Sequence, residues 1–255
     1  MQVHQDLIFD LGVNQGEDSA FYLAKGFRVV GVEANLALAR AVAATFRDEI
    51  AAGRYTLLAA GLWSAPGSLP FYVNLDNHHW SSFDRAYGCR EGTRFEVVPV
   101  QCLTIADVIA AHGMPRYMKV DVEGADRIVL KGLEAFSPRP PFVSVEEYGV
   151  AAVDDLAALG YSRFAFVPQH AKRLHRPPKP AREGRYAERA FTMLDTGLFG
   201  RELPEPWMDY GQAREAFVAT VRREDGTWTG PEGEWFDVHA ALPGALPDAA
   251  GGTPP

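Results

Sequence analysis

Strand-length apolar runs alternate with helix-forming segments near the N-terminus, and this order constrains the fold more than any other feature of the chain. Residues 7–12 and 28–33 are short apolar runs, which is typical of strands covered on both faces. Residues 17–25 and 36–52 have helical composition, and residues 55–62 form a third apolar run. Strands and helices in this order predict βαβ units in a parallel sheet with right-handed crossovers.

The same alternation continues after an interruption between residues 63 and 101. In that interruption we expect an exposed strand, a polar loop and another strand, over 68–74, 76–84 and 95–101. Beyond it we expect strands and helices in the following order: a helix over 105–113, a strand over 117–124, a helix to about 133, a strand over 142–147, a helix over 150–159, and strands over 161–168 and 191–195. The chain is therefore an α/β protein with a mostly parallel sheet.

Composition excludes several classes of protein. The chain has 255 residues, with 25 Lys+Arg against 33 Asp+Glu, so its net charge of −8 disfavours a nucleic-acid partner. No apolar run approaches the roughly 20 residues that span a bilayer, and the N-terminus lacks a secretory pattern. The two cysteines, Cys89 and Cys102, form no C-x-x-C pair. We expect a cytoplasmic protein with reduced thiols.

The segment DLGVNQGED, residues 10–18, is the first candidate for a binding site. Gly12 and Gly16 allow a sharp turn after the first strand and a close approach of the backbone to a ligand. This turn lies at the carboxyl edge of the sheet, where ligands bind in open α/β folds. Glu17 and Asp18 in the first helical turn disfavour a diphosphate and favour a ligand with a cationic end, such as S-adenosylmethionine. A tight turn without a ligand is the alternative.

Glu33 strengthens the prediction of a nucleoside site. It ends the second strand 21 residues after Gly12, where an acidic side chain can accept both hydroxyls of an adenosine ribose. A solvated carboxylate at a strand end is the ordinary alternative. The turn and the carboxylate together favour the nucleoside site.

At these residues the chain resembles the FkbM family of S-adenosylmethionine-dependent methyltransferases. The resemblance covers roughly residues 6–167 and rests on these segments: FDLGVNQGEDS (9–19), VVGVEAN (29–35), the serines of WSSFD (80–84), YMKVDVEGADRIVLKGLE (117–134) and FVSVEE (142–147). It implies a Rossmann-like class I methyltransferase fold with a seven-stranded sheet. It also implies O-methylation of a small acceptor, a saccharide or a natural product.

The resemblance assigns cofactor-binding roles to residues of the first three strands. It implies that Gly12, Asn14 and Gly16 line the methionine end, that Glu33 holds the ribose, and that Ala60 and Gly61 lie near the adenine. We also expect Asp10, which precedes the turn, to bind the cofactor.

Asp121 and Glu123 are candidates for work at the acceptor. They share one face at the end of their strand, so both carboxylates point into the expected cleft. Asp121 contacts the methionine part of the cofactor or orients the acceptor hydroxyl, whereas Glu123 either acts in the site or caps the helix that follows. An alcohol acceptor benefits from a general base, and His78 and His79 are the imidazoles expected nearest the cleft.

Further candidates for substrate binding are Ser81 and Ser82 in the polar loop and Glu146 and Glu147 at the end of a strand. Asp121 with one of these glutamates suggests an all-oxygen Mg²⁺ site. A metal-free site in which a glutamate binds a sugar hydroxyl is equally open, so the metal is not assigned.

The C-terminal part is less informative. The basic segment 170–185 either faces an anionic acceptor or is a solvated linker, and Trp207, Trp228 and Trp235 are either buried or stack on a sugar. We expect a methyltransferase domain over 1–200, an extension packed on it over 201–240 and a flexible tail over 241–255. The sequence does not determine the oligomeric state.

Two rival functions remain at this stage. A non-catalytic nucleoside-binding accessory protein would keep the pocket without the chemistry, because a fold alone does not settle function. An NAD(P)-dependent oxidoreductase is disfavoured by the G-x-x-x-G turn and by the acidic start of the helix.

Overall fold

A computed structural model describes residues 1–247 of the chain. Its large sheet has seven strands in the order β3-β2-β1-β7-β8-β10-β9. Their bounds are β1 Val3–Leu11, β2 Arg28–Val32, β3 Tyr55–Leu58, β7 Met114–Val120, β8 Phe142–Glu146, β9 Arg163–Pro168 and β10 Phe236–Ala241. Five neighbouring strands are parallel, whereas β10 runs antiparallel to both β8 and β9. The predicted mostly parallel seven-stranded sheet is confirmed.

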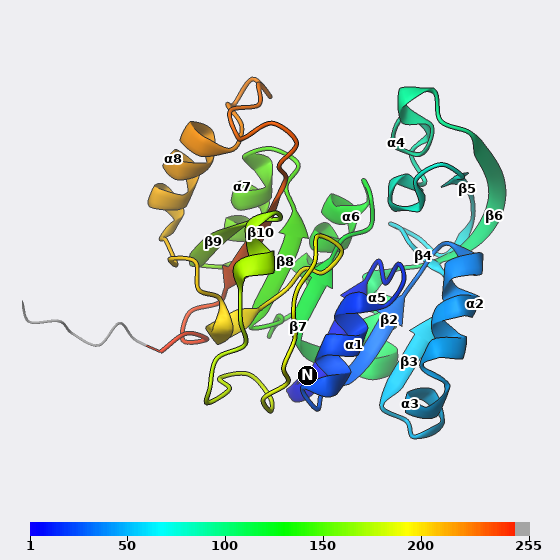
Figure 1. Ribbon diagram of the computed structural model, residues 1–255, viewed down its shortest axis with the longest axis horizontal. Coiled ribbons are helices and arrows are strands. Elements are labelled where there is room, and N and C mark those ends of the chain that lie inside the picture. The colour runs from blue at the N-terminus through cyan, green and yellow to red at the C-terminus, as the bar shows by residue number, and fades with distance from the viewer. Residues whose placement is uncertain (248–255) are drawn as a thin grey trace, which may run out of the picture.

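Helices cover both faces of this sheet (Figure 1). Their bounds are α1 Glu17–Ala24, α2 Leu36–Thr45, α3 Arg47–Ala51, α4 Arg85–Gly88, α5 Ile105–His112, α6 Asp126–Gly132, α7 Ala151–Ala158 and α8 Tyr210–Thr220. Alternate residues of β1 belong to two apolar cores: Phe9 packs with residues of α5 to α8, and Ile8 packs with residues of α1 and α2. This alternation explains why the strand is apolar throughout.

A second, three-stranded sheet has the order β4-β6-β5 and lies outside the large one. It consists of β4 Gly61–Leu62, β5 Gly67–Asn74 and β6 Phe95–Leu103. Figure 1 shows β5 and β6 extending beyond α2, with α4 near their far end. The predicted strand over 55–62 is therefore two strands in two sheets, β3 and β4. The predicted helix over 36–52 is likewise two helices, which meet at Phe46.

The predicted last strand over 191–195 is wrong, because these residues form a loop. The seventh strand is β10, from the region expected to pack as an extension over 201–240. That region therefore contributes a strand to the sheet itself. The expected tail over 241–255 begins inside β10 at Ala241, and Leu246 packs against the core on the α1 side. Residues 248–255 lie outside the described part of the chain.

Candidate functional site

A cavity with a volume of about 490 Å³ opens at the carboxyl edge of the large sheet. Two groups of residues line it. The cofactor side, as we name it, comprises Gly12, Asn14, Glu33, Leu38, Ala60, Gly61 and Phe71, and the acidic side comprises Asp121, Glu123, Glu146 and Asp237. The sequence-based prediction of a cleft at this edge thus coincides with a real cavity.

The glycine turn is shaped by contacts within the protein. Gly12 has a φ of +87°, and a Cβ there would lie 1.7 Å from the carbonyl oxygen of Asp121. Gly16 has a φ of +93°, and a Cβ there would lie 2.6 Å from the ring of Phe46. Both positions therefore require glycine whether or not a ligand is bound. Gly12 and Asn14 line the cavity, whereas Gly16 lies behind it as the N-cap of α1.

Asp10 also lies behind the cavity rather than in its lining. Its carboxylate is fully buried and accepts a hydrogen bond from Ser19 Oγ at 2.6 Å. Burial raises the pKa of Asp10 to about 6, against the opposing effect of Lys119. Its geometry supports the turn and does not present an oxygen to a ligand.

Lys119, on β7, connects the turn with the acidic side, and sequence reasoning assigned it no role. Its ammonium group donates to the carbonyl oxygen of Gly12 at 2.9 Å. It also lies 3.3 to 3.5 Å from the carboxylates of Asp10, Asp18 and Asp121. These anions hold the pKa of Lys119 well above its usual range despite burial. The sequence did contain a signal for this role: a lysine inside an otherwise apolar strand, just before two acidic residues.

The acidic start of α1 is more neutral than the sequence suggested. The carboxylate of Asp18 accepts from the backbone N–H of Thr196 at 2.8 and 3.0 Å and also faces Lys119. Within residues 1–247, Glu17 forms no ion pair with a basic side chain, and burial raises its pKa. Only one carboxylate, that of Glu17, is therefore left to repel a diphosphate at this helix start.

Glu33 lines the cavity at the end of β2 and is 7% exposed. Its two oxygens accept from the backbone N–H groups of Asn14 at 2.8 Å and Asn35 at 2.7 Å. Burial raises the pKa of Glu33 to about 7, in spite of these hydrogen bonds. Each carboxylate oxygen has a second lone pair, so the group can still accept from ligand hydroxyls. Its fixed position suits a ribose-binding role.

Apolar side chains continue the cofactor side beyond Glu33. Ala60 and Gly61 line the cavity there with Leu38 and Phe71. A Cβ at Gly61 would lie 2.2 Å from the ring of Phe83, so glycine lets this ring pack close to the chain. The predicted adenine-side pair thus lies in the cavity, next to apolar side chains.

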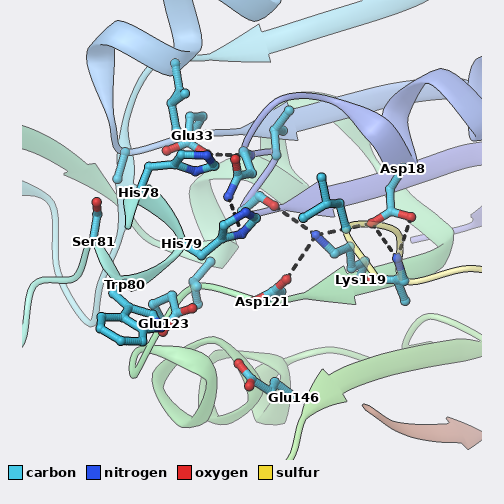
Figure 2. A pocket seen from close by; sticks show the side chains of 18 of the residues that line it. Asp18, Glu33, His78, His79, Trp80, Ser81, Lys119, Asp121, Glu123 and Glu146 are labelled. Atoms are coloured by element: carbon cyan, nitrogen blue, oxygen red, sulfur yellow. Dashed lines mark hydrogen bonds and ion pairs between the residues drawn. The ribbon is translucent and has the colours of Figure 1, made fainter. Parts of the chain in front are cut away.

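The loop that carries the two histidines contacts the glycine turn, and Figure 2 shows His78 and His79 side by side, with Glu33 next to His78. A 3₁₀ turn over His78–Trp80 brings His79 Nδ1 to 2.9 Å from the side-chain amide of Asn14. The Nε2 atom of His78 lies 2.8 Å from the side-chain amide of Gln15. Burial and the neighbouring His78 lower the pKa of His79, which favours its neutral form. Both histidines line the cavity, as the sequence reasoning expected.

The two serines of the loop differ in their position relative to the cavity. Ser81 lines the cavity and accepts from the backbone N–H of Asn74 at 3.1 Å. Ser82 is 1% exposed and donates to the carbonyl oxygen of Glu123 at 2.6 Å. Ser82 therefore ties the loop to the turn after β7 and is not part of the lining.

The acidic side brings carboxylates from three strands together. One oxygen each from Asp121, Glu123 and Glu146 lies within 4.8 Å of the others. Glu123 has a φ of +45° and pairs with Arg90 at 3.4 Å, and it does not cap the following helix, which has no side-chain cap. Asp126, the first residue of that helix, accepts from the backbone N–H groups of Val122 and Gly124 in the preceding turn. Burial and the charge of Asp121 raise the pKa of Glu123 to about 8.

Glu146 and Glu147 point in different directions. Burial and the neighbouring carboxylates raise the pKa of Glu146 well above its usual range. Glu147 instead forms an ion pair with Arg222 at 2.6 Å and accepts from the N–H of Gly149. The structure therefore places Glu147 outside the cavity lining, against the prediction of a shared substrate-binding role.

Residues after β9 close the far end of the cavity. Lys172, from the basic segment, is buried and donates to Gln169, and both line the cavity. The rest of that segment packs on the protein surface, where buried Glu183 pairs with Arg116 and Arg201. Trp235 lines the cavity as well, whereas Trp207 packs near Phe142 and Trp228 near Phe236.

Asp237 on β10 completes the acidic side, and sequence reasoning missed it. It is 8% exposed, and burial raises its pKa to about 7. The residue lies in a segment expected to pack outside the sheet, so no pattern placed it at the site.

A family model matches the part of the chain that contains most of this site. The model of the methyltransferase FkbM domain matches residues 10–164. The structure of methyltransferase FkbM from Methylobacillus flagellatus is 22% identical with a TM-score of 0.40; the match covers 56% of this chain and 33% of that one. The chain thus spans about a third of that protein. No curated protein matches the chain.

Two other solved structures are similar over most of the chain. Precorrin-6y C5,15-methyltransferase from Geobacter metallireducens is 10% identical over 94% of this chain and 81% of its own, with a TM-score of 0.41. A SAM-dependent O-methyltransferase from Thermotoga maritima is 11% identical over 94% of this chain and 60% of its own, with a TM-score of 0.35.

Within residues 1–247, no helix has the length and apolarity needed to cross a membrane. The family model covers more than half of the sequence and includes the glycine turn, Glu33 and the acidic residues after β7. The chain therefore belongs to the FkbM family of methyltransferases.

Proposed function

We propose that the chain transfers a methyl group from S-adenosylmethionine to a hydroxyl of a small acceptor, a saccharide or a natural product. One observation carries the proposal: a single cavity joins an apolar, Glu33-containing side to a side rich in carboxylates. The first suits a nucleoside and the second suits a hydroxyl-bearing acceptor. Methyl transfer requires both ligands in one enclosed space, because the reaction is an in-line displacement.

The cofactor side fits adenosine and methionine in sequence. Ala60, Gly61 and Leu38 offer an apolar surface to adenine, and Glu33 offers carboxylate oxygens to the ribose hydroxyls. Gly12 and Asn14 then face the methionine end. The carboxylate of Glu17, close to this end, attracts the cationic sulfonium or amino group.

The acidic side supplies groups that orient and deprotonate the acceptor. The carboxylate of Asp121 is held by Lys119 and accepts the acceptor's O–H. The Asn14 amide donates to Nδ1 of His79, so neutral His79 carries its proton on Nε2, and this N–H can donate a hydrogen bond to the acceptor oxygen. In the reaction the bond from sulfur to methyl breaks and the bond from oxygen to methyl forms. The hydroxyl proton passes to the carboxylate of Asp121, and S-adenosylhomocysteine leaves as a neutral thioether.

Calorimetry with S-adenosylhomocysteine tests the first half of this proposal. We expect one site per chain with binding saturated at or below millimolar ligand, and the folded protein should melt at a higher temperature with ligand. A folded protein that shows neither heat nor a thermal shift at millimolar ligand would contradict the function.

The second half is tested with a panel of sugars and hydroxylated natural products and labelled S-adenosylmethionine. Products that carry the label as an alkali-stable ether indicate O-methylation. Label recovered on nitrogen or carbon would contradict the O-methyl assignment while leaving the donor in place.

A further inference from the structure

The carboxylates of the acidic side lie in a row across three adjacent strands. Val120 of β7 is paired with Val145 of β8, so Asp121 and Glu146 occupy the next positions of the two strands. Glu146 is in turn directly paired with Asp237 of β10. Side chains of directly opposed residues lie on the same face, and like charges in such pairs repel. The row therefore carries an electrostatic cost within the protein alone.

The basic groups of the cavity neutralise only part of this row. Lys119 lies 3.3 Å from Asp121, and Arg90 lies 3.4 Å from Glu123. The carboxylates of Glu146 and Asp237 have no hydrogen-bond or ion-pair partner among residues 1–247. Other carboxylates act unfavourably on both, and at Asp237 the charges of Lys172 and Lys119 offset this in part.

Asp237 is the observation that most directly favours a cationic ligand here. Its side chain is more than nine-tenths buried, lines the cavity and has no partner in the described chain. Burying an unpaired carboxylate is unfavourable unless a ligand or a proton compensates the charge. A positive charge delivered into the cavity would compensate Asp237 and Glu146 together.

The distances favour a metal ion as that charge. Three oxygens, from Asp121, Glu123 and Glu146, already converge to within 4.8 Å of one another, which is compatible with ligands of one ion. All the donors are carboxylate oxygens, with no sulfur or imidazole among them, and such sets suit Mg²⁺ or Mn²⁺. We propose that Asp121, Glu123 and Glu146 bind a divalent cation of the Mg²⁺ class, with Asp237 beside them as an additional negative charge.

The chemical role of this cation rests on the proposed function. A divalent ion next to Asp121 would coordinate the acceptor hydroxyl and lower its pKa, so that the base removes the proton more easily. Its binding does not rest on that function, because the ligands belong to the chain itself.

Titration with Mn²⁺, followed by electron paramagnetic resonance of the free ion, tests the site without cofactor or acceptor. We expect one Mn²⁺ per chain, displaced by excess Mg²⁺. Glu146→Gln should weaken binding at least tenfold, and Asp237→Asn should weaken it severalfold through the lost charge. Glu96→Gln is the matched control, because Glu96 is exposed on β6, and its affinity should stay within twofold of the wild type.

Thermal melts of the same variants keep the result interpretable. Both cavity variants remove an unpaired carboxylate, so they should melt no lower than the wild type without metal, and Mn²⁺ should stabilise the wild type more than either. A folded wild type that binds no Mn²⁺ at millimolar concentration would overturn the proposal. Equal affinity in the wild type and Glu146→Gln would overturn it too.

Two further outcomes distinguish the metal site from a cationic acceptor and from the proposed function. Stabilisation by a polyamine such as spermidine, without Mn²⁺ binding, would overturn the metal site in favour of a cationic acceptor. Mn²⁺ binding that follows the expected variants, in a protein that does not bind S-adenosylhomocysteine, would support the metal site and contradict the proposed function.

Discussion

The two sides of the cavity differ in how their buried charges are compensated. Beneath the cofactor side, Asp10 and Asp18 share the ammonium group of Lys119, and Glu33 accepts two backbone N–H groups. On the acidic side, Glu146 and Asp237 have no such partners in the described chain. A region whose buried charges are compensated by other groups of the protein is already ordered before a ligand binds. A region whose buried charges have no partner in the protein gains part of its stability from a bound ligand.

The largest expected effect comes from removing the compensating lysine. Lys119→Met leaves Asp10 and Asp18 buried without a cation, and breaking a buried ion pair in this way costs about 3–5 kcal/mol. Urea denaturation measures the free energy of unfolding. Lys131→Met is the control, because Lys131 is exposed on α6 and its loss should change little. Equal stability of the two variants would show that Lys119 does not organise the site.

The next effect concerns ligand affinity on the cofactor side. Glu33→Gln keeps the size of the side chain but loses its charge and one acceptor oxygen, so S-adenosylhomocysteine should bind about 10- to 100-fold more weakly. Calorimetry measures the dissociation constant, and a melt of the free variant reports any loss of the contacts to Asn14 and Asn35. An unchanged constant in a folded variant would remove Glu33 from the ribose site.

A smaller effect, opposite in sign, is expected from Asp237→Asn in metal-free protein. The folded-state pKa of Asp237 is raised to about 7, so between pH of about 4 and 7 the folded chain binds a proton that the unfolded chain has lost. Stability is therefore highest at the acidic end and falls as pH rises through this window.

Asn carries no proton to lose, so Asp237→Asn should gain about 1 kcal/mol or more over the wild type at pH 8. Its melting temperature should also depend less on pH. Lys172, Lys119, Asp121 and Asp18 also act on this carboxylate, so the comparison is made in constant salt. A variant less stable than the wild type at pH 8 would show that Asp237 is already compensated.

The smallest effect is expected next to Glu146. Glu147→Gln alters the ion pair with Arg222 outside the cavity lining, so S-adenosylhomocysteine and Mn²⁺ affinities should stay within twofold of the wild type. A large loss of either affinity would show that Glu147, like Glu146, contributes to ligand binding in the cavity.

The sequence predicted the parts of the fold that depend on local patterns. Apolar strands, the glycine turn and Glu33 follow one another at short spacing, so periodicity and motif were enough to place them. The predicted strand over 191–195 was wrong because a short apolar run does not reveal its hydrogen-bonding partners. β10 pairs with β8 and β9 from far along the chain, and only tertiary contacts select it.

The candidate site divides in the same way. Residues at the ends of predicted strands, such as Glu33, Asp121 and Glu146, reached the cavity because parallel strands end at one edge. The direction of a side chain after a strand end was not predictable, as Glu147 shows. Lys119 and Asp237 were missed because their importance comes from neighbours that are distant in sequence.

The position of β10 between β8 and β9 has a consequence for the newly made chain. Translation must proceed from Glu146 to Ala241, 241 − 146 = 95 residues, before the strand that pairs with both neighbours exists. At about 5–20 residues per second this takes roughly 5 to 20 s. During that interval the apolar edge of β8 is open to other nascent chains, and chaperones that shield exposed strand edges should improve the yield of the protein.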